Sequence, residues 1–106
     1  MVPFMSLAHM VYFTLNDSSP SARQALLASC REYLTGHPGT VYFSCGTLIE
    51  SLSRPVNDRE FDVALNVVFA SRADHDAYQV SERHQKFIAL NKPTWKKVRV
   101  FDSDVE

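Results

Sequence analysis

The chain has 106 residues, enough for one domain with a single hydrophobic core and too few for two. Hydrophobic residues make up 45% and charged residues 22% of it, as in an ordinary globular protein. Because the net charge is −1, the composition offers no basic surface for nucleic acid or an anionic membrane, and we expect neither partner.

Signals for disulfides, export and membrane insertion are weak. Cys30 and Cys45 are too few and too far apart for a disulfide framework or a zinc site, so we expect buried, reduced thiols and a cytoplasmic protein. Residues 1–10 are apolar but no basic residue precedes them, and nowhere do about 18 apolar residues run together. We therefore expect neither a leader peptide nor a membrane span.

Two strands and a helix are predicted in the first half of the chain. Residues 7–15 are rich in β-branched and aromatic residues, and both alternating faces are weakly polar, which indicates a strand covered on both sides. Ser19 and Pro20 supply an N-cap and a first-turn proline for a helix that should end at residues 36–39. Residues 40–49 are predicted to form the second strand.

The second half predicts a strand, a helical region and a last strand. Residues 61–69 show the most regular apolar and polar alternation of the sequence, typical of a strand. Ser71 lies three positions before an aspartate and should start a helix, and residues 81–90 form a second short helix or its continuation. Residues 95–101 should be a strand at a sheet edge, anchored by Trp95.

This order, strand, helix, strand, strand, helical region, strand, predicts an α+β protein of ferredoxin-like (βαββαβ) topology, with one sheet and helices on one face. We expect residues 1–106 to form a single domain. The opposite face would then be apolar, at positions Ala8, Met10, Tyr12, Tyr42, Leu48 and Val68. Such a surface predicts a symmetric homodimer with sheet against sheet, a dimeric α/β barrel.

Three residues are candidates for chemistry. His9 lies in the apolar odd row of the first strand, where burial would lower its pKa, or it is a core histidine satisfied by a hydroxyl or a carbonyl. His84 precedes Phe87 by three positions, so on a helix the two share an inward face. If Tyr78 points into the same space, a base, a hydroxyl donor and an apolar wall would make a pocket for a small aromatic or enol ligand; otherwise the three residues only pack separately.

The remaining histidines are predicted to be solvated. His37 precedes a proline in a turn, and His75 lies between Asp74 and Asp76 on a polar stretch. Neighbouring helix positions diverge by about 100°, so these three consecutive residues cannot converge on one ion. We therefore expect no metal site.

Several of these segments resemble the stress-responsive α/β-barrel (Dabb) family. The resemblance rests on residues 7–13, on residues 63–71, and on Tyr78 with His84 and Phe87, and spans almost the whole chain. It implies a dimeric α+β barrel. In one branch, the plant olivetolic acid cyclase-like proteins, a tyrosine and a histidine drive an aldol ring closure of a linear polyketide without metal or cofactor.

By this resemblance His84 is a general base, Tyr78 holds the ligand's carbonyl oxygen, and His9 lines the pocket, with no cofactor. Ser81 stands where the family often has a further histidine, and Val63 where the cyclase-like branch has a polar residue. Three readings stay open: a cofactor-free cyclase, lyase or isomerase; a non-catalytic dimeric stress or ligand-binding protein; and a small monooxygenase, with haem on His9 or His84.

Overall fold

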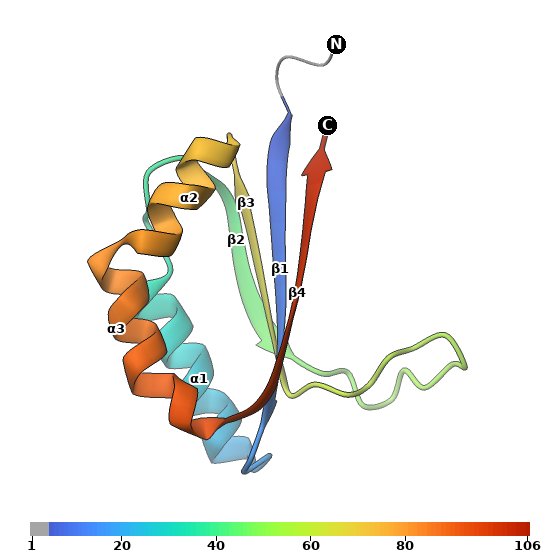
Figure 1. The fold of residues 1–106 in the computed structure, drawn as a ribbon. Coiled ribbons are helices and arrows are strands. Elements are labelled where there is room, and N and C mark those ends of the chain that lie inside the picture. Colours follow the sequence, from blue (N-terminus) through green and yellow to red (C-terminus); the bar gives the residue numbers. More distant parts are fainter. Residues whose placement is uncertain (1–4) are drawn as a thin grey trace.

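The computed structural model describes residues 5–106 and has one four-stranded antiparallel sheet with helices on one side (Figure 1). The first four residues of the segment examined for a leader peptide lie outside this range. The elements are β1 (Ser6–Leu15), α1 (Pro20–Tyr33), β2 (Thr40–Thr47), β3 (Val63–Phe69), α2 (Arg72–Val80), α3 (Glu82–Asn91), a 3₁₀ turn (Lys92–Thr94) and β4 (Trp95–Val105). The strand order is β2-β3-β1-β4, which confirms the predicted ferredoxin-like topology.

Serine side chains begin all three α-helices. Ser19 Oγ accepts from the Ala22 backbone N–H, and Pro20 occupies the first turn of α1, where its missing N–H removes no hydrogen bond. Ser71 caps α2, as predicted. Ser81 ends α2 and caps α3, so the helical region is two helices rather than one continuous helix.

The hydrophobic core lies between the sheet and the helices. It contains the apolar residues at the odd positions of β1 and β3, the buried apolar residues of α1, and Tyr78 and Phe87 from α2 and α3. Trp95 packs against the Phe13 and Phe87 rings, with centroids 5.0 and 5.8 Å away, as expected for an anchor. Cys30 is fully buried, Cys45 is half-buried, and both are free thiols. Burial raises the pKa of Cys30 to about 12, so this thiol is inert.

Three predicted strand boundaries were wrong. β2 ends at Thr47 instead of residue 49, and β3 begins at Val63 instead of residue 61. Asp62 leaves the strand pattern because its carboxylate turns inward. β4 continues to Val105, four residues beyond its last predicted position, because its backbone pairs with β1 as far as Ser6. Main-chain pairing does not need apolar side chains, so polar residues continue this edge strand.

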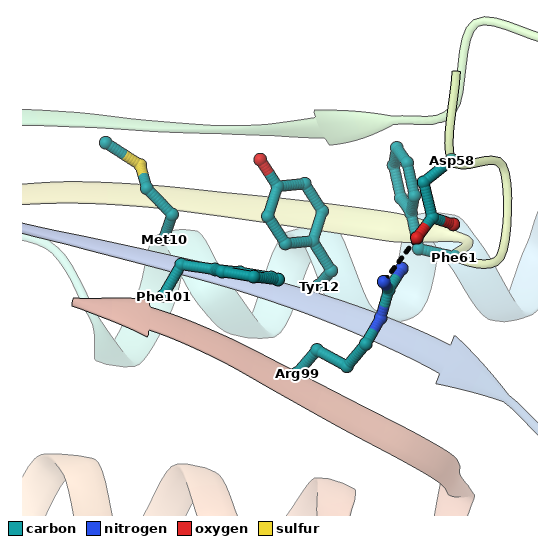
Figure 2. A pocket seen from close by; sticks show the side chains of 6 residues that line it. All are labelled: Met10, Tyr12, Asp58, Phe61, Arg99 and Phe101. Carbon is teal, nitrogen blue, oxygen red and sulfur yellow. Dashed lines mark hydrogen bonds and ion pairs between the residues drawn. The ribbon is translucent and has the colours of Figure 1, made fainter. Parts of the chain in front are cut away.

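The sheet face opposite the helices is only partly covered within residues 5–106. The β2–β3 connection extends away from the sheet on this side, opposite the helices (Figure 1). The Tyr12 ring lies edge-on to Phe61 and Phe101, with centroids 5.0 and 5.7 Å away. Together with Met10, Asp58 and Arg99 they line a hollow of about 430 Å³, across which Arg99 pairs with Asp58 (Figure 2). None of the helices in the described range is long and apolar enough to cross a membrane.

Candidate functional site

A second cavity, of about 180 Å³, lies between the sheet and the helices. It opens beside β4, whose Val98 and Val100 are 37% and 50% exposed although they point to the helix side. Most of its wall is apolar, and the polar residues are His9, Tyr78, Gln79, His84 and Trp95. The structure therefore brings His9, Tyr78 and His84 to one cavity, although they come from β1, α2 and α3.

The four histidines of the chain gather around Tyr78. The Tyr78 ring centroid lies 4.7 Å from that of His84, 4.9 Å from that of His37 and 6.1 Å from that of His9. The fourth histidine, His75, contacts His9 with ring centroids 5.1 Å apart.

Both histidines predicted to be solvated belong to this cluster, so that prediction was wrong. His37 is buried, and its Nε2 lies 2.7 Å from the Tyr33 carbonyl oxygen. The side chain of His75 is 13% exposed. His75 lies three residues before the buried Tyr78, so the two share the helix face that turns toward the sheet.

Ser81 fixes the positions of Tyr78 and His84. Its hydroxyl donates to the Tyr78 carbonyl at 2.8 Å and accepts from the His84 backbone N–H at 3.2 Å. A serine can make both bonds because its hydroxyl is donor and acceptor. Where the family often has a further histidine, this chain therefore has a structural cap.

His84 is a neutral base in this structure. Burial lowers its pKa to about 4, the positive charges that His9 and His37 carry when protonated lower it further, and the nearby Gln79 backbone raises it. Its Nδ1 is buried and has no hydrogen-bond partner among the described residues. At neutral pH one nitrogen of this ring can therefore accept a proton or a hydrogen bond.

Tyr78 remains protonated. Burial raises the pKa of its hydroxyl well above the usual value of a phenol. The hydroxyl oxygen is buried and unpaired within residues 5–106, and the same holds for the indole Nε1 of Trp95. Two donors and one neutral imidazole nitrogen, none of them with a partner in the described chain, thus belong to residues that line the same cavity.

His9 has a partner in β4 that the sequence did not predict. Its Nδ1 lies 2.5 Å from Asp102 Oδ1, and the two residues are direct cross-strand neighbours in β1 and β4. Burial lowers the pKa of His9 and outweighs the Asp102 carboxylate, which raises it. Asp102 falls just beyond the strand end predicted from apolar alternation, so no sequence signal connected it with His9.

The fold is that of a ferredoxin-like α+β domain, and histidines and a tyrosine line its cavity. The model of the Dabb family, described as the stress responsive A/B barrel domain, matches residues 7–105. The chain therefore belongs to the Dabb family, as its motifs predicted. None of the curated proteins compared with it matches.

Solved structures agree with this fold. A dimeric ferredoxin-like protein of unknown function from Thermobifida fusca is 17% identical with a TM-score of 0.81, covering 99% of this chain and 95% of that one. A Dabb family protein from Mesorhizobium loti is 22% identical with a TM-score of 0.77, covering 93% and 95%. A hydroxynitrile lyase from Passiflora edulis is 21% identical with a TM-score of 0.75, covering 95% and 94%.

Proposed function

We propose that this Dabb domain binds a small carbonyl compound in the cavity between sheet and helices and acts on it by acid–base chemistry. The observation that carries the proposal is the unpaired Tyr78 hydroxyl and His84 Nδ1, both buried, on rings 4.7 Å apart in one cavity wall. An unsatisfied buried polar group costs about 1–3 kcal/mol, and such groups call for a partner. A carbonyl ligand supplies an acceptor for the hydroxyl.

In the proposed mechanism, the neutral His84 ring removes a proton from the carbon next to the carbonyl. The C–H bond breaks, an N–H bond forms on the imidazole, and the negative charge moves to the carbonyl oxygen. Tyr78 O–H donates to that oxygen and stabilises the enolate. The proton transfer contributes about 10²–10⁴-fold in rate. His9 lines the cavity and touches the Tyr78 ring from the sheet side.

The size of the cavity limits the ligand. Pockets for drug-sized molecules have about 300–1,000 Å³, whereas a cavity of about 150 Å³ holds benzene in another protein. The 180 Å³ here suit a ligand not much larger than benzene. A linear polyketide or a haem would have to extend beyond the cavity, so the volume favours a small carbonyl compound over the cyclase and haem alternatives.

The low pKa of His84 restricts the carbonyl compounds from which this residue can remove a proton. A base with a pKa of about 4 is weak, so it suits a carbon acid already activated by a second electron-withdrawing group. The same fold is found in at least one enzyme, since the Passiflora edulis structure is a hydroxynitrile lyase. The non-catalytic alternative keeps the same cavity and uses it only for binding.

Ethyl acetoacetate is a suitable probe, because it is small and its α-protons are activated by two carbonyl groups. In D₂O at pH 5.5, His84 is still unprotonated while hydroxide-driven exchange is slow. We expect the protein to accelerate deuterium uptake at the α-carbon, followed by proton NMR, with saturation by the probe. Saturable binding without faster exchange would favour the non-catalytic alternative, and absence of both would contradict the proposal.

The partly open sheet face supports a homodimer. Tyr42 and Phe101 are each 54% exposed on this face. Phe101 lines the 430 Å³ hollow together with Met10, Tyr12 and Phe61 (Figure 2). The Thermobifida fusca structure of the same fold is described as dimeric. We therefore propose that two copies pack sheet against sheet and bury about 1,200–2,000 Å² in total.

Phe101→Lys tests this interface. Lysine replaces an exposed aromatic ring on an edge strand, so the isolated chain should stay folded, while a symmetric interface would have to bury two ammonium groups. We expect light scattering at micromolar concentration to give a dimer for the wild type and a monomer for the variant. Leu90→Lys, which replaces a 60% exposed residue on the helix side, should remain dimeric. A monomeric wild type would contradict the dimer.

A further inference from the structure

Three elements bring potential metal ligands together around His9, which also lines the cavity. His9 comes from β1, His75 from α2 and Asp102 from β4. One ligand atom from each lies within 4.8 Å of the others. Residues 74–76, for which the sequence predicted no metal site, do diverge along α2, and the further ligands come from the sheet.

Each imidazole is held by a carboxylate at its Nδ1. Asp102 Oδ1 lies 2.5 Å from Nδ1 of His9, and Asp76 Oδ1 lies 2.9 Å from Nδ1 of His75. An N–H at Nδ1 donating to a carboxylate leaves the lone pair of a neutral ring on Nε2. Metal-binding histidines are commonly oriented in this way, because the outer carboxylate fixes the tautomer and raises ligand basicity.

The two Nε2 atoms face the same side chain. The amide nitrogen of Gln79 lies 3.4 Å from Nε2 of His9 and 3.4 Å from Nε2 of His75. Ligands about 2.0–2.1 Å from a tetrahedral zinc ion are about 3.3–3.4 Å apart. The amide group is therefore as far from each Nε2 atom as two ligands of one zinc ion are from each other. Turning the amide by 180° places its oxygen there.

We propose that His9 and His75 bind one divalent transition metal ion of the zinc class through Nε2. The Gln79 side-chain oxygen is the third ligand, and solvent completes the tetrahedron. Asp102 and Asp76 hold the Nδ1 protons and balance the charge of the ion. Imidazole nitrogens suit Zn²⁺, Cu²⁺ and Ni²⁺, and hard ions such as Mg²⁺ prefer oxygen, which selects the class of ion.

The two carboxylates beside the imidazoles lie close to solvent. Asp102 and Asp76 have side chains 45% and 55% exposed, so both can be charged without a large desolvation cost. The site involves neither His84 nor the Tyr78 hydroxyl, but it shares His9 and Gln79 with the cavity wall.

Zinc chloride titrated into the full, tag-free chain after removal of metals tests the proposal by calorimetry. We expect one ion per chain and visible absorption bands of tetrahedral Co²⁺ when that ion replaces zinc. His75→Ala should weaken zinc binding by about 100-fold or more, because loss of an outer carboxylate alone costs about 10–100-fold. Asp102→Asn should fall within that smaller range.

Two matched controls locate the site. His37→Gln removes a buried histidine outside the site, and His84→Ala removes the proposed base; both should keep wild-type zinc affinity. Circular dichroism checks that each variant is folded, and the Co²⁺ spectrum of the wild type needs no variant. Zinc binding weaker than about 1 mM in the wild type, or equal affinity of His75→Ala and wild type, would overturn the site. Because His84→Ala loses exchange activity and keeps zinc, failure of the metal site and failure of the proposed function are distinguishable.

Discussion

Asp62→Ala should lower the free energy of unfolding by about 3–5 kcal/mol, the usual cost of removing one partner from a buried ion pair. Asp62 is 4% exposed. Its Oδ1 accepts from Arg23 Nη2 at 2.9 Å, and its Oδ2 accepts from the Leu15 backbone N–H at 2.8 Å. The carboxylate thus joins α1, the end of β1 and the start of β3. Its loss leaves the Leu15 N–H without its partner and leaves the Arg23 guanidinium with only the more distant Glu50 carboxylate, at 3.5 Å.

Urea unfolding measures this change, and Glu60→Ala is the matched control. Glu60 lies two residues away, its side chain is 79% exposed, and its carboxylate forms an ion pair with Lys97 at 4.0 Å. Surface changes of this kind usually stay within about 0.5 kcal/mol. If Asp62→Ala and Glu60→Ala have the same midpoint, the Asp62 network does not hold the sheet to α1.

His84→Ala should slow the exchange of ethyl acetoacetate α-protons by about 10²–10⁴-fold, to near the rate without protein. The imidazole is the proposed base, and no other unpaired imidazole nitrogen among residues 5–106 is buried beside the Tyr78 hydroxyl. The melting temperature should change little, because the lost packing is offset by removal of an unpaired buried nitrogen. Proton NMR gives the rate and circular dichroism the melting temperature.

Tyr78→Phe separates the packing role of the Tyr78 ring from the donor role of its hydroxyl. It keeps the ring that packs against Phe69, at 4.9 Å between centroids, and removes the donor to the enolate oxygen. Exchange should fall by about 10²–10³-fold, the cost of one such donor elsewhere.

If His84→Ala unfolds the protein, or exchanges protons as fast as the wild type, His84 is a packing residue and the acid–base mechanism is wrong.

Most of the fold was predictable from local patterns. The alternation of residues 61–69, the serine–proline start of α1 and the serine at position 71 each act within a few residues, and the structure has the corresponding elements. The errors lie where a tertiary contact overrides the local pattern. Asp62 looked like an outward polar residue of a strand, yet it is buried because Arg23 and the Leu15 N–H converge on it.

The site was predictable only in part. His9, Tyr78 and His84 were connected by the inward face of α3, by the row of β1 and by family resemblance. His75 and His37 were missed because both lie among polar or turn residues, and only the close approach of α2 to the sheet encloses them. Gly39 contributes to this approach: a Cβ there would lie 2.1 Å from a side-chain carbon of Asp74, and its φ of +82° also favours glycine.

The state of His84 also contributes to the pH dependence of stability. Its pKa in the folded chain is about 4, below the ordinary value of 6.5. The unfolded chain therefore binds this proton more readily between these pH values. The contribution of His84 to stability is complete above pH 6.5 and is lost as the pH falls toward 4. This window lies in the acid range and leaves the neutral base intact near pH 7.

Imidazole ¹⁵N NMR of His84 across a pH titration, with and without ethyl acetoacetate, tests whether His84 is the neutral base that meets the ligand. We expect the His84 ring to protonate near pH 4 and its Nδ1 signal to move when the probe is added at pH 5.5, while the ring signals of His37 stay in place. Protonation of His84 near pH 6.5 together with an Nδ1 signal that ignores the probe would contradict it.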